Sequence, residues 1–265
     1  FGFFKIIFCF FIHITWCAII ESLLFQICFF YFVFCLLRHI FAPLNMALGN
    51  LDILNRDYKK MHIEERIMNA FLDFKKVLIT TSFGVDSIFL LHLIHKIRPK
   101  APIYFIDTRY LFEETLEYKK SVQEILSLNI VTLKTEDWKN KFTRRDQSWK
   151  FNPDFCCKVN KVEPLDNIKP DFDIWMTGLR GYQNKHRKDL NVFEAFGDMI
   201  KFHPLIDIDE SYIKTYIKIH ELPNHPLVEK NYNSIGCVHC TVPGSSRDGR
   251  WAGKAKTECG LHLRS

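Results

Sequence analysis

The chain has 265 residues, a net charge of +6 and 48% hydrophobic residues, so it is long enough to bury a sizeable core. This charge suits an anionic substrate but is too small to indicate nucleic-acid binding. Because no convincing export signal precedes the nine cysteines, we expect no disulfide framework and a reducing, cytoplasmic location.

The first 45 residues differ in composition from the rest of the chain. Their fixed charges are Lys5, Glu21 and Arg38, and their two apolar runs each approach the roughly 17 to 25 residues of a bilayer span. The first methionine is Met46, where ordinary globular composition begins. We therefore interpret residues 1–45 as translated upstream sequence in preference to a membrane anchor. Membrane contact is expected only if the mature protein contains this segment.

The remaining chain predicts strands that alternate with helices. Apolar residues spaced three and four apart indicate helices, whereas short β-branched runs indicate strands. The predicted helices cover residues 62–74, 88–97, 113–126 and 212–220, and the predicted strands cover residues 77–81, 103–107, 130–133 and 174–178. This alternation is typical of a parallel α/β sheet with helices on both faces. Ligands of such sheets bind at the carboxyl ends of the strands.

The loop after the first predicted strand is a candidate phosphate site. Ser82, Gly84, Asp86 and Ser87 precede or begin a helix, where free backbone N–H groups and the helix dipole favour an anion. The loop has neither the Walker spacing nor the G-x-G-x-x-G spacing. A simple helix cap by Ser82 or Asp86 is equally compatible with these residues.

Two basic clusters are further candidates for binding an anion. Arg180 and Arg187 follow the predicted strand at 174–178, where they could grip phosphate or sulfate through bidentate hydrogen bonds. A solvated basic face is the simpler alternative. Arg247 and Arg250 lie in a Gly-containing segment that we expect to be mobile.

Four cysteines could hold one metal centre. They form the adjacent pair Cys156-Cys157 and the motif Cys237-x-x-Cys240. Because neighbouring side chains on a regular helix or strand diverge, the adjacent pair needs a local distortion to serve one centre. Structural zinc prefers two C-x-x-C pairs, so we favour an iron–sulfur cluster over zinc or unrelated buried cysteines. Lys161 could tune the cluster through its charge, although a solvated lysine is equally compatible.

Cys259 stands apart from these four, within Glu-Cys-Gly-Leu-His near the end of the chain. Lys254, Lys256 and His262 flank it, and cationic neighbours lower the pKa of a thiol and keep it ionised. We therefore predict that Cys259 is a nucleophile, carried to a bound anion by a mobile arm.

The ordered motifs resemble those of the assimilatory reductases of adenylyl sulfate and phosphoadenylyl sulfate. The resemblance runs from about residue 77 to residue 262 and rests on Ser82-Phe83-Gly84-x-Asp86-Ser87, Ile106-Asp107-Thr108, Cys156-Cys157-x-x-x-Lys161-Val162-Glu163-Pro164-Leu165, Thr177-Gly178-Leu179-Arg180, Ser234-Ile235-Gly236-Cys237-x-x-Cys240 and Glu258-Cys259-Gly260-Leu261-His262. It implies an adenine-nucleotide α-hydrolase-like fold. A nucleotide-binding reductase domain with the cluster site would cover residues 46–240, and a mobile catalytic tail would cover residues 241–265.

The resemblance also implies a reaction, namely thioredoxin-dependent reduction of adenylyl sulfate to sulfite and AMP in assimilatory sulfate reduction. The Cys259 thiolate would attack the sulfonyl sulfur, and thioredoxin or glutaredoxin would release sulfite from the S-sulfonated cysteine. The four other cysteines would hold a 4Fe-4S cluster, while the arginines and His262 would bind the substrate. Because all four cluster cysteines are present, adenylyl sulfate is favoured over its 3′-phosphate. A homo-oligomer is compatible with this assignment.

Two departures from the family pattern and two rival functions remain. Gly181 and Asn184 replace an arginine and a serine that the family often shows after Thr-Gly, which leaves that side of the anion site undefined. An ATP-pyrophosphatase-type adenylating enzyme with a cluster does not explain the motif around Cys259. A non-catalytic metal-binding module would be distinguished by replacing Cys259 with serine, which should leave such a module unchanged.

Overall fold

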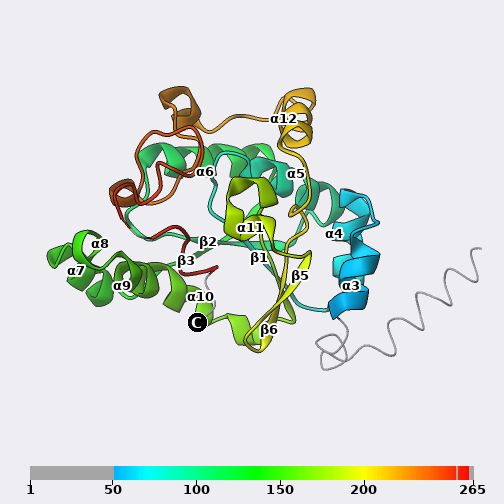
Figure 1. Cartoon of the computed structure of the whole chain (residues 1–265), viewed down its shortest axis with the longest axis horizontal. Coiled ribbons are helices and arrows are strands. Elements are labelled where there is room, and N and C mark those ends of the chain that lie inside the picture. Colours follow the sequence, from blue (N-terminus) through cyan, green and yellow to red (C-terminus); the bar gives the residue numbers. More distant parts are fainter. Residues whose placement is uncertain (1–50, 255, 263–265) are drawn as a thin grey trace, which may run out of the picture. The chain divides into compact units, whose positions relative to one another are not determined.

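The computed structural model describes residues 51–254 and 256–262, and a six-stranded sheet forms its centre (Figure 1). Residues 47–265 group into one compact unit by their contacts. The prediction made for residues 1–45 lies outside the described residues. Within the described part, no helix is both long enough and apolar enough to cross a bilayer.

The sheet is parallel except at one edge. Its strands are β1 (Val77–Thr81), β2 (Pro102–Ile106), β3 (Asn129–Leu133), β4 (Ile174–Met176), β5 (Phe193–Phe196) and β6 (Met199–Phe202). They lie in the order β3-β2-β1-β4-β6-β5, and only β5 runs antiparallel to its neighbour. The parallel sheet is therefore confirmed. The edge hairpin was not predicted, since its two four-residue strands are separated only by a tight turn in which Gly197 has φ +58°.

Helices flank the sheet and connect its strands. They are α3 (Leu51–Tyr58), α4 (Ile63–Asp73), α5 (Ser87–Ile97), α6 (Glu113–Ile125), α7 (Asp137–Arg145), α8 (Ser148–Phe151), α9 (Pro153–Cys157), α10 (Glu163–Asp166), α11 (Lys185–Lys188) and α12 (Glu210–Ile219). The shorter turns are the π-helical η1 (Lys158–Val162) and the 3-10 turns η2 (Lys169–Asp171), η3 (Gly181–Gln183), η4 (Pro226–Lys230) and η5 (Val238–Cys240). The predicted helices correspond to α4, α5, α6 and α12.

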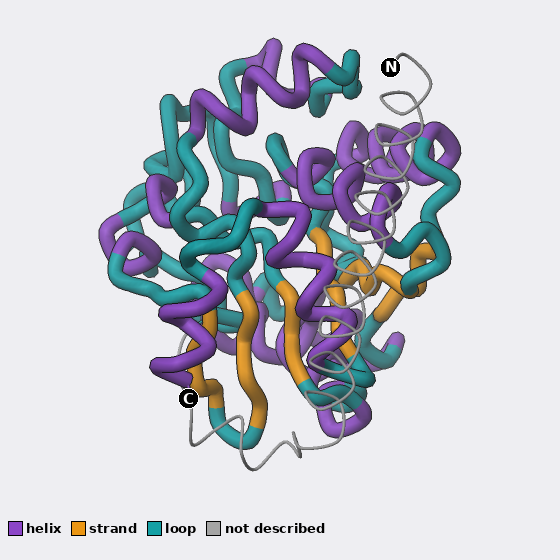
Figure 2. Tube along the Cα trace, turned by 90° about the vertical axis from the view of Figure 1, so that its right-hand side faces the viewer, coloured by secondary structure: helices purple, strands orange, loops and turns teal. Residues whose placement is uncertain are grey.

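Helices cover both faces of the sheet (Figure 2), and the strand side chains alternate between two apolar clusters. Ile79 of β1 and Met176 of β4 pack into the larger apolar cluster with α3, α4, α5, α6 and α12. Their neighbours Leu78 and Trp175 belong to a smaller cluster that includes Leu165 of α10. This period of two is what a strand buried on both faces requires. The predicted α/β class, with helices on both faces, is confirmed.

The strand order locates a crevice beside β1. From β1 the chain continues to β2 and β3 on one side, and it later returns to β4 on the other side. Such a reversal leaves an opening at the carboxyl ends of the two central strands, which is where α/β sheets bind ligands. The loops that follow β1 and β4 border this opening.

Candidate active site

The loop between β1 and α5 is held in one conformation by its own contacts. Phe83 has φ +47°, a region that is unfavourable for a bulky side chain, and its fully buried ring packs edge-on against Phe105 at 5.4 Å. The backbone N–H and the hydroxyl of Ser87 both donate to the Gly84 carbonyl, at 3.0 and 2.7 Å. These contacts fix the polar loop at the N-terminus of α5.

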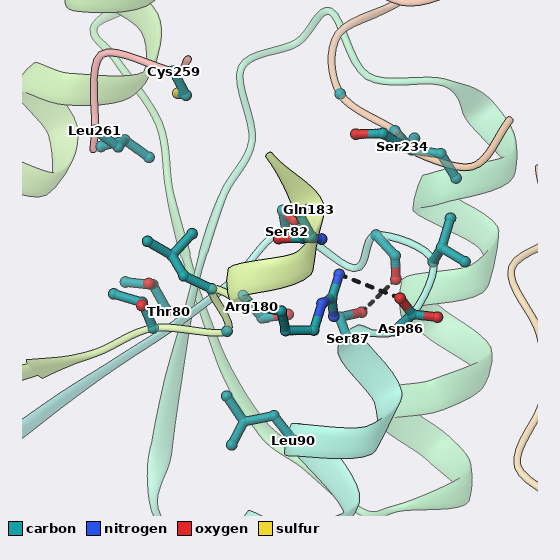
Figure 3. A pocket seen from close by; sticks show the side chains of 18 of the residues that line it. Thr80, Ser82, Asp86, Ser87, Leu90, Arg180, Gln183, Ser234, Cys259 and Leu261 are labelled. Carbon is teal, nitrogen blue, oxygen red and sulfur yellow. Dashed lines mark hydrogen bonds and ion pairs between the residues drawn. The ribbon is translucent and has the colours of Figure 1, made fainter. Parts of the chain in front are cut away.

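Asp86 occupies the N-cap position of α5 but forms no side-chain cap hydrogen bond. Its carboxylate instead faces Arg180 from the loop after β4, with Nη2 and Oδ2 3.3 Å apart (Figure 3). The Arg180 side chain is buried, and its Nε has no hydrogen-bond partner among the described residues. A buried donor without a partner costs free energy, so this guanidinium is placed to receive an acceptor from a ligand.

Two more arginines bring unpaired donors to the same pocket. Arg250 donates from Nη1 to the Ile235 carbonyl at 3.0 Å and lies over the Trp251 ring at 4.5 Å. Its Nε and the Nε of Arg247 are buried without a partner in the described structure. Burial and the nearby Arg187 charge lower the pKa of Arg247 to about 10, so it still carries its charge at neutral pH. The arrangement suits an anion.

The remaining basic contacts gather around Glu258, which the sequence analysis did not select. Its carboxylate receives Arg187 Nε and Nη2, each at 2.8 Å, and Arg247 Nη2 at 2.8 Å. Asn184, one of the departures from the family pattern, adds a hydrogen bond from Nδ2 at 3.1 Å. Burial alone raises the pKa of Glu258, but Arg187 and Arg247 lower it to about 2. The only sequence signal for Glu258 was its position next to Cys259.

Cys259 is buried, with 8% of its surface exposed, so the tail that was expected to be mobile is docked in the structure. The hydrogen bond from the Cys157 thiol lowers the pKa of Cys259 well below its usual range, against the effect of burial. Lys161, the Leu261 backbone N–H and Arg250 lower this pKa further. The thiolate form is therefore favoured.

The cations near Cys259 are not the ones that the sequence suggested. Lys254 donates to the Trp149 carbonyl, and Lys256 pairs with Asp154. His262 stacks on Trp175, and burial together with neighbouring cations lowers its pKa well below the usual value, so its ring is neutral. Lys161, which is partly buried, takes their place, because the fold brings it toward Cys259 from η1.

Four cysteines line one small cavity. These are Cys156, Cys157, Cys237 and Cys240, with Lys161 beside them. The helix distortion expected for the adjacent pair is present, since the π-helical turn η1 begins directly after Cys157. Burial and the nearby Cys237 and Cys240 raise the pKa of Cys156 to about 11. Within the described residues, no three His, Cys, Asp or Glu side chains converge as a single metal ion would require.

A single pocket at the carboxyl ends of β1 and β4 brings the other predicted residues together. Its lining includes Ser82, Gly84, Asp86, Ser87, Arg180, Arg187, Arg247, Arg250, Cys259, His262 and Lys161. Lys161 also lines the cysteine cavity, so it separates the two sites. The segment 233–236 lines the pocket as well, and three of its residues precede Cys237 in a motif that resembles the family. Gln183, to which the sequence analysis assigned no role, is a further lining residue.

Comparisons with known proteins match most of the chain. Residues 76–243 match the family model of the phosphoadenosine phosphosulfate reductase domain. The chain is similar to the adenosine 5′-phosphosulfate reductases of Bacillus thuringiensis strain Al Hakam and Bacillus cereus strain AH820, each 42% identical over 225 residues, or 81% of this chain and 90% of the relative. It is also similar in structure to phosphoadenylyl-sulfate reductase from Candida auris in a phosphate complex, with TM-score 0.63, 27% identity, and coverage of 72% of this chain and 95% of that one.

Proposed function

The chain belongs to the phosphoadenosine phosphosulfate reductase family, and from this premise we propose which substrate it takes and which residues act on it. It is an oxidoreductase of sulfur groups that serves sulfate assimilation by reducing an adenylyl sulfate or its 3′-phosphate. We propose adenylyl sulfate as the preferred substrate. The support is the complete set of four cysteines in one cavity and the printed names of the 42% identical relatives.

In the proposed reaction, Cys259 is the nucleophile. Its thiolate attacks the sulfonyl sulfur, a bond between the two sulfur atoms forms, and the bond from sulfur to the bridging phosphate oxygen breaks. AMP leaves with the electron pair of that bond, and Cys259 carries the sulfonate. A dithiol protein of the thioredoxin type then attacks Cys259 Sγ, so that sulfite leaves and the donor ends as a disulfide. Two electrons pass from the dithiol to sulfur, as a reducing cytoplasm would permit.

The arginines reduce the repulsion that opposes this attack. A thiolate approaching a sulfonyl phosphate meets negative charge on both groups, and fixed cations placed at that charge lower the barrier. The unpaired Nε groups of Arg180, Arg247 and Arg250 support this role. The loop from Ser82 to Ser87 would hold the nucleotide at the N-terminus of α5.

The four cavity cysteines fit a 4Fe-4S cluster. In such a cluster each thiolate binds a different iron, so the sulfur atoms need to surround a cavity and need not converge on one point. When bound, the cluster would supply a fixed charged group beside Lys161, and the electrons for the reaction would come from the thiol donor. A Cys157 thiolate bound to iron has no proton with which to donate a hydrogen bond to Cys259. Lys161 and Arg250 would then keep the Cys259 thiolate ionised.

The observation that carries the proposal is a buried Cys259 in one pocket with three buried arginine Nε donors that have no partner among the described residues. The test measures sulfite release by the anaerobically purified chain with thioredoxin and either adenylyl sulfate or its 3′-phosphate. We expect faster release from adenylyl sulfate. Cys259→Ser should release none while retaining cluster absorbance at about 400 nm, whereas Cys237→Ser should lose that absorbance. Sulfite from the Cys259→Ser variant would exclude this mechanism.

A further inference from the structure

Glu258 takes no part in the chemistry above, although it is a buried carboxylate inside the anion pocket. We propose that Glu258 is a positioning residue that docks the tail by binding Arg187 and Arg247, so that Cys259 is held at the substrate site. Arg187 then binds the tail. Arg180, Arg250 and the Nε of Arg247 contact the substrate directly. The inference deepens the proposed function and rests on it for the role of Cys259.

The hydrogen bonds of the arginines separate them into two kinds. Arg187 uses Nε and Nη2 on Glu258 and Nη1 on Gln183, so each of its nitrogens has a partner within the protein. Arg180 and Arg250 each keep a buried Nε without one among the described residues. A guanidinium in which every nitrogen already has a partner gains less from a new acceptor than one with a buried Nε that has none.

The Glu258 contacts join three separate segments. Arg187 lies in α11 and Asn184 directly precedes this helix, whereas Arg247 comes from the segment between Cys240 and Cys259. The same carboxylate accepts the backbone N–H of Cys259 at 2.8 Å. A bidentate pair fixes both distance and orientation, so the position of the Cys259 backbone follows from the position of these arginines.

A second anchor lies on the other side of Cys259. Lys201 of β6 donates to the Leu261 carbonyl at 2.9 Å, and the Leu261 side chain packs against the apolar cluster around Trp175. The backbone around Cys259 is therefore anchored at Glu258, directly before it, and at Leu261, two residues after it. Loss of Glu258 should loosen the tail around Cys259 without releasing all of it, because the Leu261 anchor remains.

Docking of the tail matters because Cys259 reacts first with the nucleotide substrate and then with the dithiol donor. In the docked position it reaches the pocket, but with 8% exposure it is closed to a protein thiol. The tail must therefore open before the donor can attack, and the Glu258 contacts set how often it is docked. Weaker docking lowers the rate of the sulfonyl transfer and leaves nucleotide binding by the α5 loop almost unchanged.

The experiment uses the full chain with Glu258→Ala, Glu258→Gln and, as a matched control, the exposed Glu117→Gln. Without substrate, we measure alkylation of Cys259 by iodoacetamide with mass spectrometry, and tryptic cleavage after Lys256, which is independent of thiol ionisation. Both should be about 10-fold faster in Glu258→Ala, as expected when a buried ion pair loses one partner. Glu258→Gln keeps an acceptor oxygen and should be intermediate, while Glu117→Gln should match the unchanged chain.

Steady-state kinetics supply the second readout. For Glu258→Ala we expect kcat for sulfite release to fall about 10-fold or more, with KM for adenylyl sulfate within about 3-fold of its original value. Arg187→Ala combined with Glu258→Ala should be no worse than Glu258→Ala alone, because Arg187 acts through Glu258. Arg180→Met should instead raise KM.

Two results would overturn the inference. One is unchanged alkylation and cleavage in both Glu258 variants, and the other is a raised KM with an unaltered kcat. If Glu258→Ala fails to fold, the near-isosteric Glu258→Gln decides by the same measurements. Absence of sulfite from both nucleotides, together with faster alkylation in the variants, would refute the proposed function while leaving the tail anchor supported.

Discussion

Gly236 makes room for a guanidinium in the anion pocket. A Cβ at this position would lie 2.2 Å from Nη2 and 2.4 Å from Cζ of Arg250. No side chain tolerates such a distance, so the arginine would have to leave the Ile235 carbonyl and the Trp251 ring. Glycine is therefore required at position 236 because the Arg250 guanidinium occupies the space of a side chain. We assign this guanidinium to substrate binding.

We expect Gly236→Ala to displace Arg250 and raise KM for adenylyl sulfate by about 10-fold, the effect of losing one charge-assisted hydrogen bond of about 1.5 kcal/mol. Thermal stability should change little, because the displaced group is the end of a flexible side chain. Steady-state kinetics and a thermal melt measure the two effects. Arg250→Ala should have the same KM, and adding Gly236→Ala to it should have no further effect. Two additive increases in KM would show that the glycine acts in another way.

Among the secondary-structure elements, the π-helical turn η1 has the clearest stabilising contact. Asn160, which is 1% exposed, donates from Nδ2 to Thr143 Oγ1 at 2.9 Å and to the Cys156 carbonyl at 3.0 Å. Its Oδ1 accepts from Asn140 at 2.8 Å. This side chain therefore ties the wide turn to α7 and to the first cavity cysteine.

We expect Asn160→Ala to lower the free energy of unfolding by about 3 kcal/mol, because it leaves several buried polar groups without partners. Denaturant titration gives the change in stability, and iron content after anaerobic purification reports on the cysteine cavity. Asn167→Ala, at an exposed position after α10, is the matched control and should behave like the unchanged chain. Equal stability of the two alanine variants would show that Asn160 does not support the turn.

His225 makes the contact between α6 and η4 dependent on pH. The ring is fully buried, its Nδ1 accepts the Leu227 N–H at 3.1 Å, and its Nε2 therefore donates to Thr115 Oγ1 at 3.1 Å. Burial lowers the pKa of His225 to about 4, although the nearby Glu114 opposes this. The charged residues of η4 are Glu229 and Lys230, and Lys230 pairs with Glu114 of α6.

The pKa of His225 is lower in the folded chain than its value of about 6.5 in the unfolded chain. The stabilisation contributed by the neutral His225 ring is therefore complete above pH 6.5 and is lost as the pH falls through about 4. We compare the unfolding free energy of the chain with that of His225→Gln, which does not titrate. The difference should shrink by about 3 kcal/mol between pH 7 and pH 4. A constant difference over that range would mean that folding does not shift the pKa of His225.

For the whole molecule, residues 47–265 contain the complete sheet and both candidate sites and group as one compact unit. We expect a chain that begins at residue 47 to keep the thermal midpoint and the sulfite release rate of the full chain. Thermal melts and activity assays of the two chains, run side by side, check this expectation. A lower midpoint or a lost activity in the shorter chain would assign a structural or functional role to the preceding residues.

Predictions from the sequence were most successful where the signal was local. The strands β1 and β2 and the helices α4, α5 and α6 were predicted at nearly their observed bounds, because periods of two and 3.6 residues are set by neighbouring side chains. The cysteine motifs likewise identified the family. The short helices α7 to α10 and the β5–β6 hairpin were missed, since a few residues carry too little periodicity to indicate an element.

The sequence by itself determined the fold class, the family and the residue types that the reaction needs, because each is encoded in contiguous motifs. Only the tertiary structure decided which partner each charge meets. Arg187 and Glu258 are 71 positions apart, and Lys161 approaches Cys259 only because η1 and the tail meet at one pocket. Ion pairs and pKa values depend on distance and burial in three dimensions, so no spacing in the chain could have shown that Glu258 holds two arginines and that His262 is neutral.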